Sequence, residues 1–402
     1  MSPEPAPKVA PVEDWTTDYD PFDPEFVADP YPVLEDLREH CPVAHSDRYN
    51  GMAVFTTFDD VATVAHHHDD FSSRRNVINN VPTDKPGLVL PPINYDPPVH
   101  TDHRRLLLPF FNPNRVAAWE EPIRQICRRL LDGLEGRAEC DIASEYAQEI
   151  PGEVTARMLG VPVAEGPRFR DWIHALVEVG PNDYNVAKAA TEDVMAYMQD
   201  LLEARRADPG DTDVVSYLLE QELDNEPLPD GEIIRALFLI MIAGIDTTWS
   251  AIGFCLHHLA AHPDDRRRLA AEPELMPTAI EEFLRVYSPV WVARVAEHDT
   301  EVNGCPVAQG DWAVIDFRSA NRDAAAFDQA DEFVIDRAQN RHTAFGLGVH
   351  RCLGSNLARL EMEIAVEMWM ERFPEFTLTD PGAVTYSAGP VRGPRHIPIR
   401  FD

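Results

Sequence analysis

The residues with the clearest chemical potential lie in one short run, FGLGVHRCLG at positions 345–354, which holds a single cysteine, Cys352. Three glycines in ten residues lose much conformational entropy on ordering, unless something lies close to the backbone or positive φ is needed. A flat metal-bearing macrocycle against this loop would exclude side chains and would use one thiolate ligand. Backbone N–H groups of an open loop can point at the sulfur and tune it. We therefore expect Cys352 to be a metal ligand.

Other interpretations of this run explain less. A nucleotide-binding G-x-G-x-x-G pattern fails because Arg351 stands where the third glycine is needed. A cysteine nucleophile needs a base that the fold positions, whereas His350 is only two residues from Cys352 along the chain. A structural turn with a buried cysteine is the remaining alternative. Axial thiolate ligation of haem iron, which favours O–O cleavage, explains the most features.

A second candidate site lies in the middle of the longest predicted helix, between Pro229 and Pro263. Asp230 is expected to cap the start, and about 32 residues would make the helix roughly 48 Å long. Its middle is apolar all round and should be buried. That middle nevertheless carries residues that weaken a helix interior, and a buried aspartate needs a partner. These residues are Gly244, Asp246, Thr247 and Thr248. A harmless kink with a satisfied aspartate is the alternative to a functional role.

Composition excludes several function classes. The 402 residues include 35 basic and 69 acidic side chains, for a formal net charge of −34. This balance argues against nucleic acid or an anionic membrane as the main partner. Six cysteines lie far apart without a C-x-x-C pair, so neither a zinc site nor a disulfide framework is indicated. The first 20 residues lack the apolar core of a signal peptide, and we expect a cytoplasmic protein.

Helical periodicity dominates most of the chain, and short strand-like pieces occur near 52–58, at 301–316 and at the C-terminal end. We predict a mainly α protein with small sheets, formed by a disordered tail over 1–20 and a single domain over 21–402. The Pro- and Asn-rich stretch 72–98 is predicted to be an unusually long loop, and such loops are usually functional or disordered.

The run F-G-x-G-x-H-x-C-x-G resembles the haem-binding signature of the cytochrome P-450 monooxygenases, and the match is complete. Three further elements agree in order and spacing. They are A-G-x-D-T-T at 243–248, similar to the family's oxygen-activating helix; E-x-x-R at Glu282 and Arg285; and DPPVHTDHRR at 96–105, similar to the helix that binds the haem propionates. The resemblance covers roughly residues 20–402 and implies the cytochrome P-450 fold, a helical domain with small β-sheets and a long central distal helix.

The resemblance also implies roles for single residues. Cys352 would be the axial thiolate on the iron of haem b, while Asp246 and Thr247 would relay protons and hold the activated oxygen as the catalytic pair. The expected haem contacts are His100, Arg104, Ala243, Gly244, Arg294, Phe345 and His350. Among these, the histidines and arginines would supply positive charge to the propionates, and Ala243 with Gly244 would leave room over the iron.

Glu282 and Arg285 would form the buried structural ion pair of the family's core. The family often adds an arginine from the segment after N-R-D as a third partner, but this chain has Glu332 at that place. Arg337 is the candidate substitute.

The implied activity is a monooxygenase that inserts one oxygen atom of O2 into a small or medium apolar substrate. We identify no flavin or iron–sulfur segment, so electrons from NAD(P)H are expected from a separate ferredoxin and ferredoxin reductase, which would dock on a basic face at Arg105, Arg351 and Arg359. Coupling or desaturation by the same haem, and a non-catalytic haem sensor, are alternatives. The expected pocket walls are Leu88, Val89, Ile242, Ala243, Val290, Val292 and Ala388.

Overall fold

The long apolar helix predicted between two prolines is the centre of the fold. In the computed structural model, which describes residues 10–78, 88–210 and 212–401, it is α11 (Asp230–Ala261). Pro229 occupies its N-cap position, and Pro263 begins the next helix. The prediction that Asp230 caps α11 is wrong, because no side chain caps it and Asp230 instead accepts a hydrogen bond from Arg206 at 2.6 Å.

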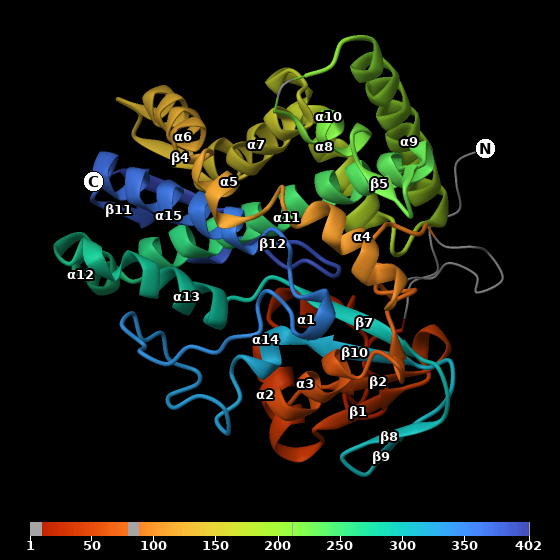
Figure 1. Cartoon of the computed structure of the whole chain (residues 1–402). Helices are drawn as coiled ribbons and strands as arrows, with labels where there is room; N and C mark the ends of the chain where they lie inside the picture. Colours follow the sequence, from red (N-terminus) through yellow and green to blue (C-terminus); the bar gives the residue numbers. More distant parts are fainter. Residues whose placement is uncertain (1–9, 79–87, 211, 402) are drawn as a thin grey trace, which may run out of the picture.

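Helices surround α11 on one side of the molecule, and a sheet with short helices forms the other side (Figure 1). The helices that pack directly on α11 include α7 (Glu149–Leu159), α8 (Gly166–Ile173), α9 (Tyr184–Ala207), α10 (Val214–Leu219), α12 (Pro263–Ala271), α13 (Met276–Val286) and α15 (Ser355–Arg372). A π-helical segment, η4 (His174–Val179), continues α8. The remaining α-helices are α1 (Pro24–Ala28), α2 (Tyr31–His40), α3 (Phe58–His66), α4 (Val99–Leu107), α5 (Pro113–Ala117), α6 (Glu120–Leu134) and α14 (Phe317–Ala320).

The largest sheet has five strands in the order β1-β2-β10-β7-β3. These are β1 (Val43–Ser46), β2 (Met52–Phe55), β10 (Trp312–Asp316), β7 (Trp291–Ala296) and β3 (Phe71–Ser72), and only the β2–β10 pair is parallel. The small sheets are β11 (Phe376–Leu378) with β14 (Pro398–Phe401) and β4 (Glu139–Asp141), β12 (Thr385–Tyr386) with β13 (Pro394–His396), β5 (Glu222–Leu223) with β6 (Glu226–Pro227), and β8 (Thr300–Val302) with β9 (Cys305–Val307). The expected mainly α fold with small sheets is confirmed.

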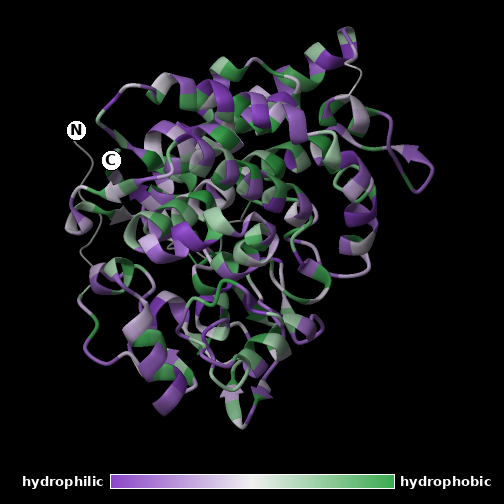
Figure 2. Ribbon diagram, turned by 90° about the vertical axis from the view of Figure 1, so that its left-hand side faces the viewer, coloured by the Kyte–Doolittle hydropathy of each residue, from purple (hydrophilic) through white to green (hydrophobic). Residues whose placement is uncertain are grey.

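Burial explains the apolar character of α11. The helix is long and apolar enough to cross a membrane, but 67% of its most apolar 18 residues are buried inside the protein. Hydrophobic and hydrophilic residues alternate along many of the other helices, as amphipathic elements around a core require (Figure 2). We therefore assign α11 to the protein core.

The N-terminal segment is more ordered than its composition suggests. Trp15 and Tyr19 pack on Phe26 of α1, and Tyr19 is fully buried. Arg48 then binds two aspartates of the segment, Asp18 at 2.6 Å and Asp20 at 2.7 Å. The predicted disordered tail over 1–20 is therefore wrong for its second half, because its aromatic residues find a buried surface. Residues 1–9 lie outside the described residues, as do 79–87 of the predicted loop 72–98.

The buried ion pair on α13 has three members. Glu282 and Arg285 are both fully buried, and two hydrogen bonds of 2.8 Å join them. Arg337 completes the group, because its Nε lies 3.1 and 3.0 Å from the two Glu282 oxygens. Glu332 contributes only its backbone carbonyl, which accepts from Arg285 at 2.6 Å. The candidate substitution of Arg337 for the missing arginine is confirmed by this geometry.

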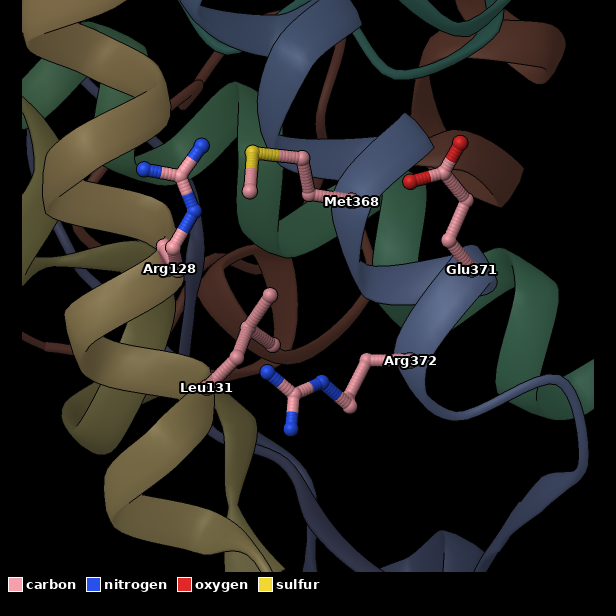
Figure 3. Close-up of a pocket in the computed structure, with 5 residues that line it drawn as sticks. All are labelled: Arg128, Leu131, Met368, Glu371 and Arg372. Carbon is pink, nitrogen blue, oxygen red and sulfur yellow. The ribbon is translucent and has the colours of Figure 1, made fainter.

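A hollow of about 320 Å³ lies between α6 and α15 (Figure 3). It is lined by Arg128, Leu131, Met368, Glu371 and Arg372. Arg372 is neutralised there by Asp132 and Glu135. The hollow is thus a charge-balanced surface feature, about 13 residues or roughly 20 Å of helix beyond the start of α15.

Candidate active site

The cysteine run forms a closed loop that leads into α15. The Cys352 N–H donates to the Phe345 carbonyl at 2.7 Å, and the Gly346 N–H donates to the Thr343 carbonyl at 2.7 Å. Gly348 has a φ of +64°, and a Cβ there would lie 2.5 Å from the Ala65 carbonyl oxygen of α3. The expectation that a bound macrocycle excludes side chains is therefore wrong for Gly348, since α3 itself fills that space.

The thiol of Cys352 is exposed, unlike a structural core cysteine. The protein atoms packed around the Cys352 sulfur nevertheless reduce its contact with water, and this desolvation raises the pKa of the thiol. A backbone hydrogen bond from Gly354 opposes the rise, together with the positive charges of Arg104, Arg351 and Arg359. The predicted N–H donor to the sulfur is therefore present. This environment is suited to a thiolate once a metal ion adds its own charge.

Three of the predicted propionate ligands gather in one buried group. The rings of His100 and His350 have centroids 4.2 Å apart, and His350 Nε2 lies 2.9 Å from Ser73 Oγ. Arg294 is 7% exposed, and among the described residues its side chain donates only to the carbonyl of the neighbouring Ala293, from Nη1 at 2.9 Å. We call His100, Arg294 and His350 the basic cluster.

No carboxylate among the described residues forms an ion pair with the basic cluster, although Asp96 acts electrostatically on His100 and Arg294. Burial, reinforced by the neighbouring positive groups, lowers the pKa of His100 to about 4 and that of His350 to about 2. Burial also lowers the pKa of Arg294 to about 10. Both ring nitrogens of His100 are buried without a hydrogen-bond partner. Both lowered pKa values disfavour protonation of the two rings while no anion is bound, and their expected charge beside the propionates stays a prediction. An anionic ligand with several acceptor oxygens, such as the two haem propionates, fits this donor set.

Arg104 binds the cysteine loop from α4, and Phe345 is the first residue of the loop. Arg104 Nη2 donates to the carbonyl of Arg351 at 2.6 Å, and burial lowers the Arg104 pKa. Phe345 is partly buried beneath Arg359, whose guanidinium carbon lies 4.4 Å from its ring centroid. Arg104 thus holds the loop beside Cys352 as well as adding positive charge there.

One face of α11 is accessible at the middle of an otherwise buried helix. Ala243 is exposed and Thr247, one turn later, is partly exposed. Thr247 Oγ1 donates to the Ala243 carbonyl at 2.7 Å, so the hydroxyl oxygen keeps its acceptor sites for a ligand. The side-chain position of Gly244 faces α7 and not the accessible face, because a Cβ on this residue would lie 3.3 Å from Thr155 Oγ1. The missing side chain of Gly244 therefore accommodates α7, and the expectation that Gly244 leaves room over the iron stays a prediction.

Asp246 does not face Thr247, because adjacent helical residues project in different directions. It is 1% exposed, and its Oδ1 accepts a hydrogen bond of 2.6 Å from Arg395 Nη2 on β13. Its Oδ2 is buried and has no hydrogen-bond partner within the described part of the chain. Burial raises the Asp246 pKa to about 6 although Arg395 opposes the rise. Sequence reasoning missed Arg395, since a buried aspartate indicates a cation but not which of the 35 basic residues supplies it.

The Asp246 pKa makes a testable contribution to stability. The native carboxyl binds its proton more tightly than the unfolded one, so its contribution to unfolding free energy falls as pH rises from about 4 to about 6. Urea unfolding of the wild type and of Asp246→Asn across this range should therefore show the wild type losing about 3 kcal/mol relative to the variant. Other carboxylates cancel in the difference. A difference that is constant or grows with pH would contradict the assignment.

Comparison with known proteins gives a consistent result. The sequence model of the family "Cytochrome P450" matches residues 171–382. Cytochrome P450 107B1 of Saccharopolyspora erythraea is 34% identical over 371 residues, covering 89% of this chain and 91% of that protein. A steroid C26-monooxygenase of Mycolicibacterium smegmatis is 34% identical over 374 residues, covering 91% of each. The crystal structure of CYP109E1 from Bacillus megaterium with testosterone is 30% identical with a TM-score of 0.86, covering 94% of this chain and 99% of that chain.

Proposed function

This chain belongs to the cytochrome P450 family of haem monooxygenases, and we propose that it inserts one oxygen atom of O2 into a small or medium apolar molecule in the cytoplasm. Electrons from NAD(P)H would reach it through a separate ferredoxin and its reductase. The observation that carries the proposal is the exposed Cys352 next to the basic cluster, with its unpaired His100 nitrogens. Together they offer a thiolate ligand for iron and donors for the two propionate anions of haem.

Haem b, when bound, supplies an iron that activates dioxygen. Cys352 would ligate that iron, and Phe345 and Ala243 would contact the macrocycle. Arg104 and the basic cluster would bind the propionates, because their donors lack anionic partners among the described residues. Binding these anions would also favour the protonated forms of His100 and His350, whose pKa values are lowered in the protein alone.

The residues of α11 would handle protons. The free Oδ2 of Asp246 can take up a proton from water, while Oδ1 stays bound to Arg395. Thr247 Oγ1 can accept a hydrogen bond from a ligand bound at the accessible face of α11, because its own proton is directed at the Ala243 carbonyl. Since the two side chains do not face each other, we expect a water molecule to pass the proton between them.

The substrate is proposed to be apolar and of steroid size. The expected pocket walls are aliphatic, and Leu88 and Val89 are 38% and 37% exposed. A relative is named for steroid oxidation, and a structural neighbour was solved with testosterone. Titrating the haem-loaded protein with steroids, terpenoids, fatty acids and aromatics should reveal a spin-state shift with the preferred class. Steroids that give no shift while another class does would overturn the steroid proposal.

Product analysis separates the other functions of the same haem. Insertion yields a product heavier by one oxygen atom, whereas coupling or desaturation removes hydrogen without adding oxygen. A non-catalytic sensor would consume no NAD(P)H in the presence of its ligand. The sensor alternative also leaves the buried Asp246 and the exposed Thr247 without a use.

The redox partner is expected to dock around Arg105 and Arg351. Both are exposed, although Arg105 also forms a solvent-exposed ion pair of 3.3 Å with Asp102 on α4. Val99 at the start of α4 and Leu108 directly after its end are each 47% exposed. We no longer assign Arg359 to the docking face. Its guanidinium lies 2.5 Å from Glu281 and covers the ring of Phe345. Charge reversal of Arg105 and Arg351 should slow reduction by an acidic ferredoxin at low salt and leave substrate affinity unchanged.

Stopped-flow reduction at several ionic strengths measures this effect. Lys188→Glu on α9 is the matched control, since Lys188 is exposed on the helix that packs with η4 and α11. Equal slowing by the control variant would indicate a general charge effect and argue against this docking face.

A further inference from the structure

One arginine lies between two carboxylates that belong to different elements. Arg395 of β13 donates from Nη2 to Asp246 at 2.6 Å and from Nε to Glu178 at 2.9 Å. Its third contact is Ser250 Oγ at 3.1 Å, and its guanidinium carbon lies 3.9 Å from the Trp249 ring centroid. The single positive charge of Arg395 is therefore shared by two carboxylates. The cation–π contact with Trp249 helps to hold the guanidinium in place.

The two carboxylates differ in their surroundings. Asp246 lies on the rigid core helix α11 and is 1% exposed, whereas the Glu178 side chain is 17% exposed on η4. Glu178 Oε2 also lies 3.4 Å from His174 Nδ1, one turn earlier. The groups that act electrostatically on Asp246 are Arg395 from β13 and Glu178 and His174 from η4.

The backbone around Arg395 is tightly attached to α11. A Cβ on Gly253 of α11 would lie 3.0 Å from Pro394, and a Cβ on Gly393 would lie 2.1 Å from Ser250 Oγ. The turn before β13 also touches η4, because a Cβ on Gly389 would lie 2.6 Å from the Val177 carbonyl oxygen. A shift of η4 would therefore change the distance from Glu178 to Arg395 more than the distance from Asp246 to Arg395.

We propose that Arg395 is a positioning residue that divides its charge between Asp246 and Glu178, so that the place of η4 sets how readily Asp246 exchanges a proton. With Glu178 close, Arg395 is partly neutralised and Asp246 takes up a proton more easily. With Glu178 withdrawn, Arg395 belongs to Asp246 and holds it ionised. The expected pocket wall Ala388 precedes Gly389, whose backbone approaches Val177 of η4. Substrate contact at Ala388 would therefore be communicated through η4 to Asp246. The functional part of this inference rests on the proposed role of Asp246.

Two substitutions should move the protonation of Asp246 in opposite directions. Arg395→Gln removes the cation and should raise the pH midpoint, whereas Glu178→Gln removes the competitor and should lower it. A shift of about one pH unit or more is expected, because an opposite charge in hydrogen-bond contact has an effect of that size. Arg395→Lys should restore most of the wild-type midpoint. A purely structural role would move both midpoints in one direction or neither.

The measurement is the infrared band of the protonated Asp246 carboxyl in the full chain, identified by its absence in Asp246→Asn and titrated with pH. Arg267→Gln, an exposed arginine of α12, is the matched control for loss of a cation and should leave the midpoint unchanged. Shifts of the same sign in Arg395→Gln and Glu178→Gln, or no shifts, would overturn the inference.

Turnover separates this inference from the proposed function. If the midpoints shift in opposite directions but Asp246→Asn turns over at the wild-type rate, the charge division is correct and the proton-relay role of Asp246 is wrong. If Asp246→Asn is slow but the midpoints do not shift, the relay role survives and the inference about Arg395 fails. The pH profile of turnover should follow the infrared midpoints if both are correct.

Discussion

Replacing Cys352 with histidine is expected to abolish oxygenase activity and the red-shifted Soret band of the reduced carbon monoxide complex. Both depend on an anionic sulfur ligand that donates electron density to the iron. A neutral imidazole lacks that charge, although the basic cluster and Arg104 should still bind the propionates. The variant should therefore retain haem but show the spectrum of an imidazole-ligated protein.

Cys305→Ser is the control, because Cys305 is a partly buried cysteine of β9 away from the loop. It should keep both the red-shifted band and the activity. An imidazole-type spectrum from the unmutated protein, or a red-shifted band that survives in Cys352→His, would show that Cys352 is not the ligand.

The parts of the site that can be predicted from sequence are those whose structure depends on residues close together in the chain. The cysteine loop is closed by hydrogen bonds within ten residues, from Thr343 to Cys352, so its residues are informative by themselves. The bounds of α11 follow from prolines at its two ends. Arg337 could be selected because it lies in the segment that binds Glu282.

Contacts between distant segments account for what sequence reasoning missed. Gly348 needs its small size because of Ala65, and Gly244 because of Thr155. Neither neighbour is near in sequence. Arg395 lies 149 residues from Asp246 in the sequence, and only the packing of β13 against α11 reveals it as the partner of Asp246. Arg359 was predicted for the docking face, but Glu281, 78 residues away, binds it.

The charge of His100 and His350 likewise depends on groups that are distant in sequence. A histidine in a ligand motif suggests a cation, but its charge depends on the anions around it. Here the nearest charged groups include Arg294 and Arg104, which act against protonation. Asp96 favours protonation of His100, but it is engaged with Ser72 Oγ at 2.5 Å and the Ser73 N–H at 2.8 Å. The charge of the pair is therefore expected to change when an anionic ligand binds.

Replacing Thr247 with alanine is expected to uncouple electron consumption from substrate oxidation. The variant keeps the helix, since alanine is the better helix former, but loses the only hydroxyl on the accessible face formed with Ala243. Oxygen and NAD(P)H should still be consumed, and the reducing equivalents should appear as hydrogen peroxide. Asp246→Asn should instead slow the whole cycle, because the proton supply fails. Acid–base steps of this kind are worth about 10²–10⁴-fold.

Product formed per NAD(P)H consumed, with peroxide quantified in parallel, measures both effects. Thr247→Ser is the decisive control, because it restores a hydroxyl at the same position and should recover much of the coupling. Full coupling in Thr247→Ala would assign the role to another donor, with Thr248 or a substrate hydroxyl as candidates. Thr248 is the weaker of the two, since it is 4% exposed and lies off the accessible face. The hydroxyl that accepts a hydrogen bond from the bound ligand must lie on the accessible face of α11. Thr247 lies on that face, with Ala243 one turn before it.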